Sequence, residues 1–324
     1  MKKIYLLLGS LFFILIAAYW GLKVYNQQAA AAKTAAAEAD VIYVTNEDTL
    51  TALSYSNGTD TLAFDFSDTT WTYHDDEALH INQTTLQSVA ASFAQLTAVR
   101  ELSEDVDALS DYGLGAPAYT LTITSSEGET TKIFIGDAFS NDTYYYGKTD
   151  ASDTIYVLNA SVVTNLVFDL NELVEIPSLP GLTTDNTLTL TRAVGSDTIS
   201  LEPDTAASTE SSTVEDQTES STAEETTSPF EDAITAIASS MIYSTQTAEP
   251  TDDELETYGL TEDTRKTYTM TYIYDDKETT FVFYAGHTDE EDTTTYIQVK
   301  GNKSVYLVSV SMIEALDTAF NEAN

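Results

Sequence analysis

The side chains with the most reactive chemistry are few in this chain. Histidine occurs at positions 74, 80 and 287, and the first two flank the acidic run Asp75-Asp76-Glu77. Imidazole and carboxylate groups together suit a metal ion, but this spacing matches no standard ligand motif. We therefore interpret residues 74–80 as a surface turn and expect no metal centre there.

Two further acidic clusters, Asp252-Asp253-Glu254 and Asp289-Glu290-Glu291-Asp292, offer the hard oxygen ligands that calcium prefers. Neither has the fixed alternation of oxygens and the central glycine of an EF-hand loop. Most such carboxylates form solvated surface, since acidic side chains are rarely buried without a partner. The sequence thus predicts no cofactor and leaves weak calcium binding open.

Two patterns that suggest binding have a structural interpretation instead. Gly113-Leu114-Gly115-Ala116-Pro117-Ala118 fits a loose dinucleotide-binding pattern, yet it contains a proline and a strand pattern follows it. We interpret it as a tight turn in which Gly113 takes a backbone angle that suits glycine. The run Tyr144-Tyr145-Tyr146 is either an aromatic binding platform or, as we favour, cross-strand packing.

Motifs that specify catalysis are missing from the sequence. It has no G-x-S-x-G elbow, no phosphate-binding loop and no H-E-x-x-H pair. We therefore assign no catalytic residue and predict that the protein is not an enzyme, with a hydrolase of unrecognised site as a further alternative.

The N-terminus carries the strongest segment signal. Residues 4–22 contain no charge and follow Lys2 and Lys3, and nineteen helical residues span about 28 Å, close to the hydrocarbon thickness of a bilayer. The sequence predicts a transmembrane signal anchor over 1–28 and an Ala-rich stalk over 29–40. By the positive-inside rule, the N-terminus is cytoplasmic and the C-terminal domains extracytoplasmic in a single-pass topology. The alternative is a signal peptide cleaved near Ala29-Ala30-Ala31.

The net charge and the cysteine content limit the possible cellular compartments and binding partners. The 324 residues carry a formal net charge of −40 and contain no cysteine. Nucleic acid is excluded as a ligand because phosphate binding needs clustered cations. The missing cysteines exclude disulfides and thiolate metal sites, and they favour a protein of the bacterial cell envelope.

The chain repeats itself. Tyr112-Gly113-Leu114 recurs as Tyr258-Gly259-Leu260, and Thr154–Ser161 recurs as Ser304–Ser311. Weaker matches precede each pair in the same order. The sequence therefore predicts two copies of one module, over 41–180 and 181–324.

Each copy shows the same order of elements. Alternating strands come first, then a helix with Leu86, Val89, Phe93 and Leu96, or with Phe230, Ile234, Ile237 and Met241. The Tyr-Gly-Leu turn, further strands and a closing helix follow, with capping boxes at Ser228 and Ser311. We predict an α+β fold: an antiparallel sheet with helices on one face in each module.

One segment departs from this pattern. Residues 204–228 are almost wholly Ser, Thr, Asp and Glu, with Val214 as the one bulky apolar residue. Such a composition cannot offset its ordering entropy, so we predict a disordered insertion in the second module.

Several of these residues together resemble the bacterial domain-of-unknown-function family numbered 4340. They are Trp71, the helix from Leu86 to Leu96, Tyr112-Gly113-Leu114 with Pro117, Ile135-Gly136 and Tyr156-Val157. The resemblance covers about 70–180 well and 230–320 more weakly. It implies a single-pass envelope protein, in some cases encoded near ABC-type transporter or gliding-type genes, and carries over no catalytic residue.

The sequence thus predicts a set of structural motif residues rather than a catalytic site. They are Trp71, Tyr112, Gly113, Leu114, Pro117, Gly136, Tyr156, Tyr258, Gly259, Leu260, Gly286 and Tyr306. Our leading hypothesis is a non-enzymatic protein, anchored in the membrane through residues 4–22, that contacts a protein partner as an accessory subunit of an envelope complex, with ABC-type transport as one candidate. The alternative is an acidic surface protein that binds cations or glycans.

Overall fold

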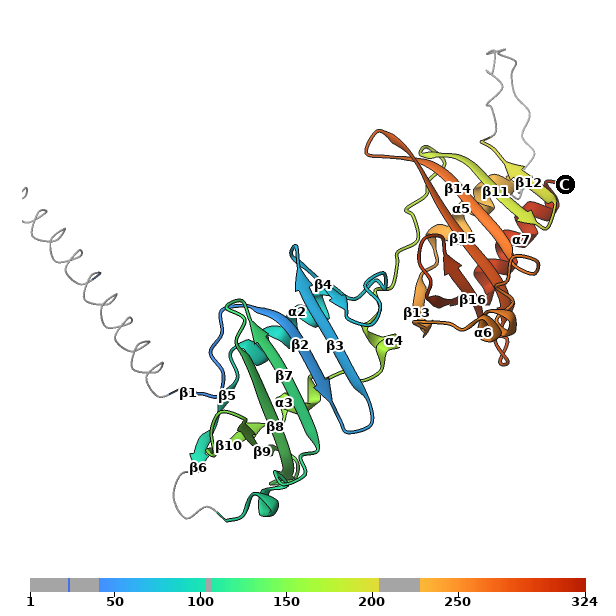
Figure 1. Ribbon diagram of the computed structural model, residues 1–324. Helices are drawn as coiled ribbons and strands as arrows, with labels where there is room; N and C mark the ends of the chain where they lie inside the picture. Colours follow the sequence, from blue (N-terminus) through green and yellow to red (C-terminus); the bar gives the residue numbers. More distant parts are fainter. Residues whose placement is uncertain (1–22, 24–40, 103–106, 204–227) are drawn as a thin grey trace, which may run out of the picture. The chain divides into compact units, whose positions relative to one another are not determined.

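The computed structural model describes residue 23 and residues 41–102, 107–203 and 228–324 (Figure 1). The predicted anchor, the stalk and nearly all of the predicted insertion lie outside these ranges. Within the described ranges, no helix combines the length and apolar character needed to cross a bilayer.

The first sheet is antiparallel and contains eight described strands in the spatial order β4-β3-β2-β7-β8-β9-β10-β6. Their bounds are Leu50–Ser56 (β2), Thr61–Ser67 (β3), Thr70–Tyr73 (β4), Arg100–Leu102 (β6), Tyr119–Ser125 (β7), Thr130–Phe139 (β8), Tyr144–Thr149 (β9) and Ile155–Asn159 (β10). A separate short ladder joins β1 (Ile42–Tyr43) to β5 (Thr97–Ala98).

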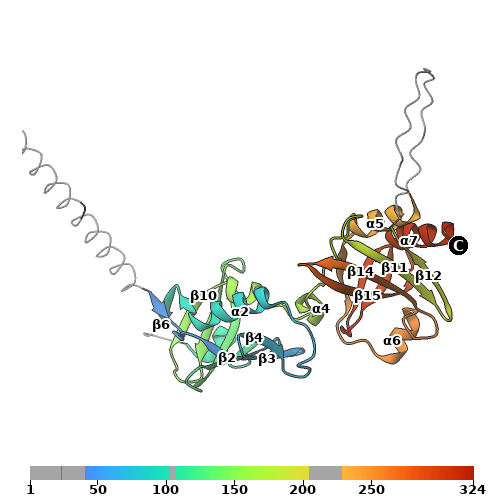
Figure 2. The same ribbon diagram turned by 90° about the horizontal axis from the view of Figure 1, so that it is seen from above.

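Alternation of apolar and polar residues decides which face of this sheet is buried. In register, Tyr55 pairs with Leu121 and Leu121 with Ile133, and all three are buried. Helix α2 (Gln83–Ala94) lies over one face (Figure 2) and buries Leu86 and Phe93. Short helices η1 (Leu109–Tyr112) and α3 (Ser161–Thr164) belong to the same compact unit as most of this sheet, whereas α4 (Leu170–Leu173) belongs to the other unit.

Trp71 lies on β4, at one edge of the first sheet, where a side chain replaces the missing neighbouring strand. Gln83 accepts the Trp71 N–H at 2.7 Å and donates to the Trp71 carbonyl at 2.8 Å. Gln87 accepts from the indole nitrogen at 3.3 Å. The exposed backbone of the edge strand is therefore satisfied by α2.

The second sheet is also antiparallel, with seven described strands in the order β12-β11-β14-β15-β16-β17-β13. Their bounds are Thr187–Val194 (β11), Asp197–Leu201 (β12), Ile242–Thr247 (β13), Lys266–Tyr274 (β14), Lys277–Thr288 (β15), Thr294–Val299 (β16) and Val305–Ser309 (β17). Helices α5 (Pro229–Ala238) and α7 (Val310–Glu322) cover one face (Figure 2), and α6 (Asp252–Thr257) precedes β14.

Helix starts were predicted well in one case and wrongly in another. The Ser228 capping box with proline at the first helical position is confirmed at α5. The box predicted at Ser311 is wrong, because α7 begins at Val310 and its cap is Ser309, whose hydroxyl accepts the Ser311 N–H. The predicted apolar stripe of α5 also ends early: Met241 lies beyond the helix and is 64% exposed.

The two sheets share a common strand order. The run β2-β7-β8-β9-β10-β6 in the first sheet corresponds to β11-β14-β15-β16-β17-β13 in the second. In both sheets, a longer helix (α2 or α5) precedes the strand at the end of this order. A short helix also leads into each Tyr-Gly-Leu turn: η1 ends at Tyr112, and α6 ends just before Tyr258. The fold is α+β with mostly antiparallel sheet, as predicted. The described residues, by contrast, fall into two compact units, one of residues up to 59 with 90–166 and the other of 60–89 with 167–324. The module limits 41–180 and 181–324 therefore stay a prediction.

The Gln83 contacts make a testable contribution to stability. We expect Gln83→Leu to lower the free energy of unfolding by about 1–3 kcal/mol, because it leaves the N–H and carbonyl of Trp71 without their partners. Chemical denaturation of the full chain measures this. The same substitution at the exposed Gln95 is the control and should stay within about 0.5 kcal/mol of wild type. Equal effects at both positions would contradict the edge-capping role.

Candidate functional site

In the first half of the fold, meaning the first sheet and its helices, the backbone of the Tyr-Gly-Leu turn packs directly against a strand. Gly113 follows η1 with φ +70° and donates its N–H to Ser110. A Cβ at Gly136 would lie 2.2 Å from the Tyr112 carbonyl oxygen. Gly136 is in a bulge of β8, between the registers at Ile135 and Ala138. The turn thus presses against a bulge that only glycine permits.

The second half repeats this arrangement in detail. Gly259 has φ +69°, and a Cβ at Gly286 would lie 2.0 Å from the Tyr258 carbonyl oxygen. Gly286 is in a bulge of β15, and the next residue, His287, donates its N–H to the same carbonyl at 2.7 Å. This bond satisfies a carbonyl that the end of α6 leaves free.

Aromatic rings pack beside both turns. The Tyr112 ring meets the Tyr146 ring edge-on at 4.8 Å between centroids, and Tyr146 stacks on Phe139 at 4.4 Å. In the second half, Tyr258 and Tyr296 lie 4.4 Å apart. The packing role favoured for the tyrosine run is confirmed for Tyr144 and Tyr146, whose rings both contact Phe139 of the adjacent strand.

The remaining predicted motif residues support packing, and Leu260 forms a buried cluster with Tyr258 and Val305. Leu114, Leu260 and Tyr306 are buried, and Pro117 is half-buried. Burial raises the pKa of Tyr306 to about 12, and the Asn302 amide donates to its hydroxyl at 2.5 Å. Burial and the nearby Glu101 charge raise the pKa of the Tyr156 hydroxyl.

The histidine and acidic run forms a polar turn, as expected. His74 is exposed and pairs with Asp65 at 2.6 Å, and this hydrogen bond raises the pKa of its imidazole. Asp75 accepts from the Tyr73 hydroxyl at 3.1 Å. Among the described residues, no three or more histidine and acidic side chains form a cluster able to hold a metal ion.

The two acidic clusters stabilise local backbone. Glu254 accepts the Thr251 N–H at 2.8 Å in a capping box at the start of α6, where negative charge is favourable. Asp289 accepts the N–H groups of Thr293 and Thr294 at 2.8 and 3.0 Å. The hydrogen bond from Thr294 is the main cause that lowers the pKa of the Asp289 carboxyl.

The sequence analysis missed a charge cluster between the second sheet and α7. Asp317 on α7 pairs with Arg192 at 2.9 Å and with Lys266 at 2.5 Å. The Tyr268 hydroxyl donates to the same carboxylate at 2.7 Å. Burial by itself would raise the pKa of Asp317, but hydrogen bonds from Lys266 and Tyr268 hold it below its usual value. A cation on the buried face of β11, two residues after Leu190, was the available signal for a partner carboxylate.

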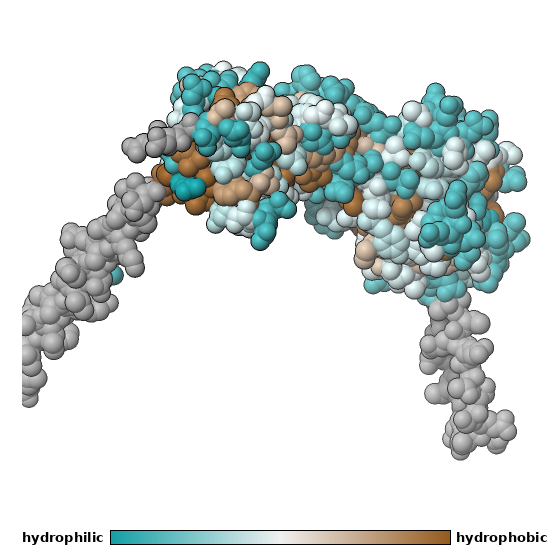
Figure 3. All heavy atoms as spheres, turned by 90° about the horizontal axis from the view of Figure 1, so that it is seen from below, coloured by the Kyte–Doolittle hydropathy of each residue, from teal (hydrophilic) through white to brown (hydrophobic). Residues whose placement is uncertain are grey.

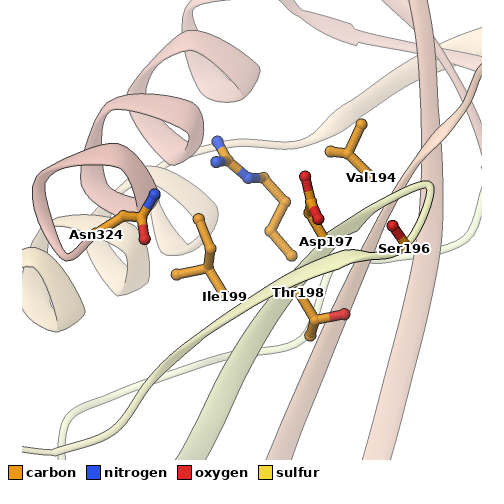
Figure 4. Close-up of a pocket in the computed structure, with 7 residues that line it drawn as sticks. Val194, Ser196, Asp197, Thr198, Ile199 and Asn324 are labelled. Atoms are coloured by element: carbon orange, nitrogen blue, oxygen red, sulfur yellow. The ribbon is translucent and has the colours of Figure 1, made fainter.

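An open hollow of about 440 Å³ lies beside this cluster, at the β11–β12 hairpin and the end of α7 (Figure 4). It is lined by Arg192, Val194, Ser196, Asp197, Thr198, Ile199 and Asn324. The Arg192 guanidinium is engaged by Asp317 and, at 2.7 Å, by the Asn321 amide oxygen. Its charge is therefore used to fix α7 on the sheet.

Comparison with protein families identifies the scaffold. The model of the family described as domain of unknown function (DUF4340) matches residues 71–251 and again 230–323. The chain belongs to this family. Neither a curated protein nor a solved structure matches it. The first match begins at Trp71, and the two together include both glycine turns.

The glycine bulge of the second half provides a direct test of the docking geometry. We expect Gly286→Ala to lower the free energy of unfolding by about 1–3 kcal/mol or more, since the new Cβ collides with backbone that cannot move freely. Gly181→Ala is the control, because nothing lies within 4 Å of its Cβ position. A Gly286→Ala chain as stable as the control would refute the close approach.

The contacts of the Asp317 carboxylate should make the free energy of unfolding depend on pH. Its folded-state pKa is lowered, so its stabilisation is present above the unfolded-state pKa near 3.8 and is lost as pH falls further through the folded-state pKa. At pH 7 we expect Asp317→Asn to cost about 1.5–3 kcal/mol, and the difference from wild type to shrink below about pH 4. Urea unfolding at several pH values measures it. Asp153→Asn, at an ion-paired carboxylate that is 99% exposed, should change little at any pH.

Proposed function

We propose that this protein is a non-enzymatic, membrane-anchored extracytoplasmic protein that acts through protein–protein contact. In this proposal it is an accessory subunit of a bacterial envelope complex, with an ABC-type transport complex as the first candidate. The anchor is the apolar segment 4–22, the N-terminus is cytoplasmic, and residues 29–40 form a spacer.

We further propose that the folded part consists of two tandem copies of one module, over 41–180 and 181–324. Three observations support this: the common strand order of the two sheets, the double family match, and the repeated glycine turn and bulge. A duplicated module provides two similar but separately variable surfaces on one anchor.

One observation carries the proposed non-catalytic role. The residues that recur in both halves are used in the interior of the fold, where Tyr112 and Tyr258 dock their carbonyls on glycine bulges. The best-organised polar cluster, around Asp317, pairs its charges internally and clamps a helix. The recurring chemistry thus builds a scaffold, and such a scaffold acts through its surface.

The surface itself fits this role. Hydrophilic side chains predominate on the face drawn in Figure 3, and apolar ones form smaller groups among them. Large apolar side chains are nevertheless exposed in both halves, among them Tyr43, Val99, Met241, Tyr243 and Tyr274. Single exposed apolar side chains occur on most protein surfaces, but contiguous ones with a polar rim are typical of interaction sites, and we expect the partner to contact such a group here.

Membrane attachment and partner contact are tested together in the native cells. We expect full-length protein to sediment with membranes and resist carbonate extraction, and a chain lacking residues 1–28 to be released. Lysine-directed crosslinking of the full-length protein in intact cells should then retrieve an envelope component, identified by mass spectrometry. Recovery of wild-type protein in the soluble fraction, or crosslinks only to abundant unrelated proteins, would contradict the proposal.

A further inference from the structure

The longest hairpin of the described chain, β14–β15, ends in a tight turn with an unusual apolar tip. Tyr274 pairs with Lys277 across the turn residues Asp275 and Asp276, whose φ angles are +50° and +57°. Aspartate tolerates this left-handed backbone better than most residues, so the turn is locally well formed. The tip is therefore an ordered element of defined shape.

This tip extends beyond both neighbouring strands (Figure 1). On one side, β11 pairs with β14 only as far as Tyr272, and the Asn186 carbonyl accepts the Ile273 N–H. On the other side, β16 pairs with β15 from Phe283 onward, and Lys300 donates to the Val282 carbonyl. The outermost residues of the hairpin thus lie past the edge of the sheet.

The core-facing side of β14 continues onto this projection. Met270 is 1% exposed, Tyr272 is half-buried and Tyr274, on the same side of the strand, is 70% exposed. Ile273, on the opposite side, is 36% exposed. An apolar strip therefore runs out of the core and ends in solvent.

The first half lacks this feature. Tyr119 pairs with Ile135 and Lys266 pairs with Ala285, and each partner directly precedes a glycine bulge. The corresponding hairpin is shorter: β7 ends at Ser125, and residues 126–129 (Ser-Glu-Gly-Glu) connect it to β8 without an apolar side chain. The shared scaffold does not require apolar side chains here, so their presence in the second half needs another reason.

We propose that the β14–β15 tip is a docking element that inserts Tyr274 and Ile273 into an apolar cleft of a protein partner with a basic rim. Asp275, Asp276 and Glu278 surround the apolar pair, against the single cation Lys277. This charge disfavours anionic lipid headgroups. It equally disfavours a second copy of a chain with net charge −40. The inference rests on the proposed function, because it assigns the contact surface of that accessory protein.

A site-specific photocrosslinker tests the docking. Full-length protein carrying benzoylphenylalanine at position 274 is irradiated in native cells, beside a matched chain with the label at Glu127 on the equivalent hairpin. We expect one discrete protein adduct from position 274 and none from position 127. Equal adducts from both positions, no adduct from position 274, or adducts with lipid or with a second copy would each overturn the inference.

The contribution of the acidic residues at the tip can be tested separately. Asp275→Asn with Asp276→Asn keeps residues that tolerate the turn and removes the two charges. We expect the adduct yield from position 274 to fall several-fold in this variant and also with rising salt, while the melting temperature stays unchanged. An adduct that is insensitive to both changes contradicts a basic rim.

A further variant separates this inference from the proposed function. Tyr274→Ser with Ile273→Thr should reduce retrieval of the partner by lysine-directed crosslinking about tenfold, as loss of an aromatic anchor does. Glu127→Ser should leave retrieval unchanged. If wild type and the tip variant retrieve the same envelope partner equally, the docking inference fails and the accessory role stands. If wild type retrieves none, both fail.

Discussion

A peptide carbonyl pressed onto a glycine bulge holds each half of this protein in register. In the second half the Tyr258 carbonyl reaches a bulge that has no room for a Cβ, and accepts the His287 N–H there. The same contact places the Tyr258 ring on Tyr296 of the adjacent strand. A helix end, a strand and its neighbour are thereby fixed by one polar contact, which the left-handed Gly259 makes geometrically possible.

The acidity of the chain shapes the rest of the fold. With so few cations, several carboxylates of the described residues accept backbone N–H groups instead of pairing with a cation, as Glu254 and Asp289 do. At the junction of α7 with the second sheet, the largely buried Arg192 and the more exposed Lys266 both pair with Asp317, and several hydrogen bonds together offset the burial of its carboxylate. Charged side chains that in the sequence suggest a reactive site thus stabilise turns, helix starts and one junction between a helix and a sheet.

The two halves keep the scaffold and vary the exposed ends. The central strand order and the glycine turn are common to both, whereas the outer strand β4 and the long β14–β15 hairpin each distinguish one half. Variation of this kind costs little stability, because edges and hairpin tips carry few packed contacts. In the proposed arrangement of two modules on one anchor, one copy can therefore acquire a contact surface without loss of the fold.

The amino-acid sequence determined the features that depend on near neighbours. Alternation fixed the strands, helical spacing fixed most of α2 and of α5, the Ser228 box fixed a helix start, and the repeated Tyr-Gly-Leu marked a turn that needs glycine, while Leu96 and Met241, predicted on these helices, lie beyond their ends. Tertiary structure alone decided the contacts between distant segments. It placed the cap of α7 at Ser309, left Met241 outside its helix, brought Asp317 to Arg192 and Lys266, and carried Tyr274 past the edge of its sheet. These depend on which strands become neighbours and where each one ends, and local propensity carries no information about either.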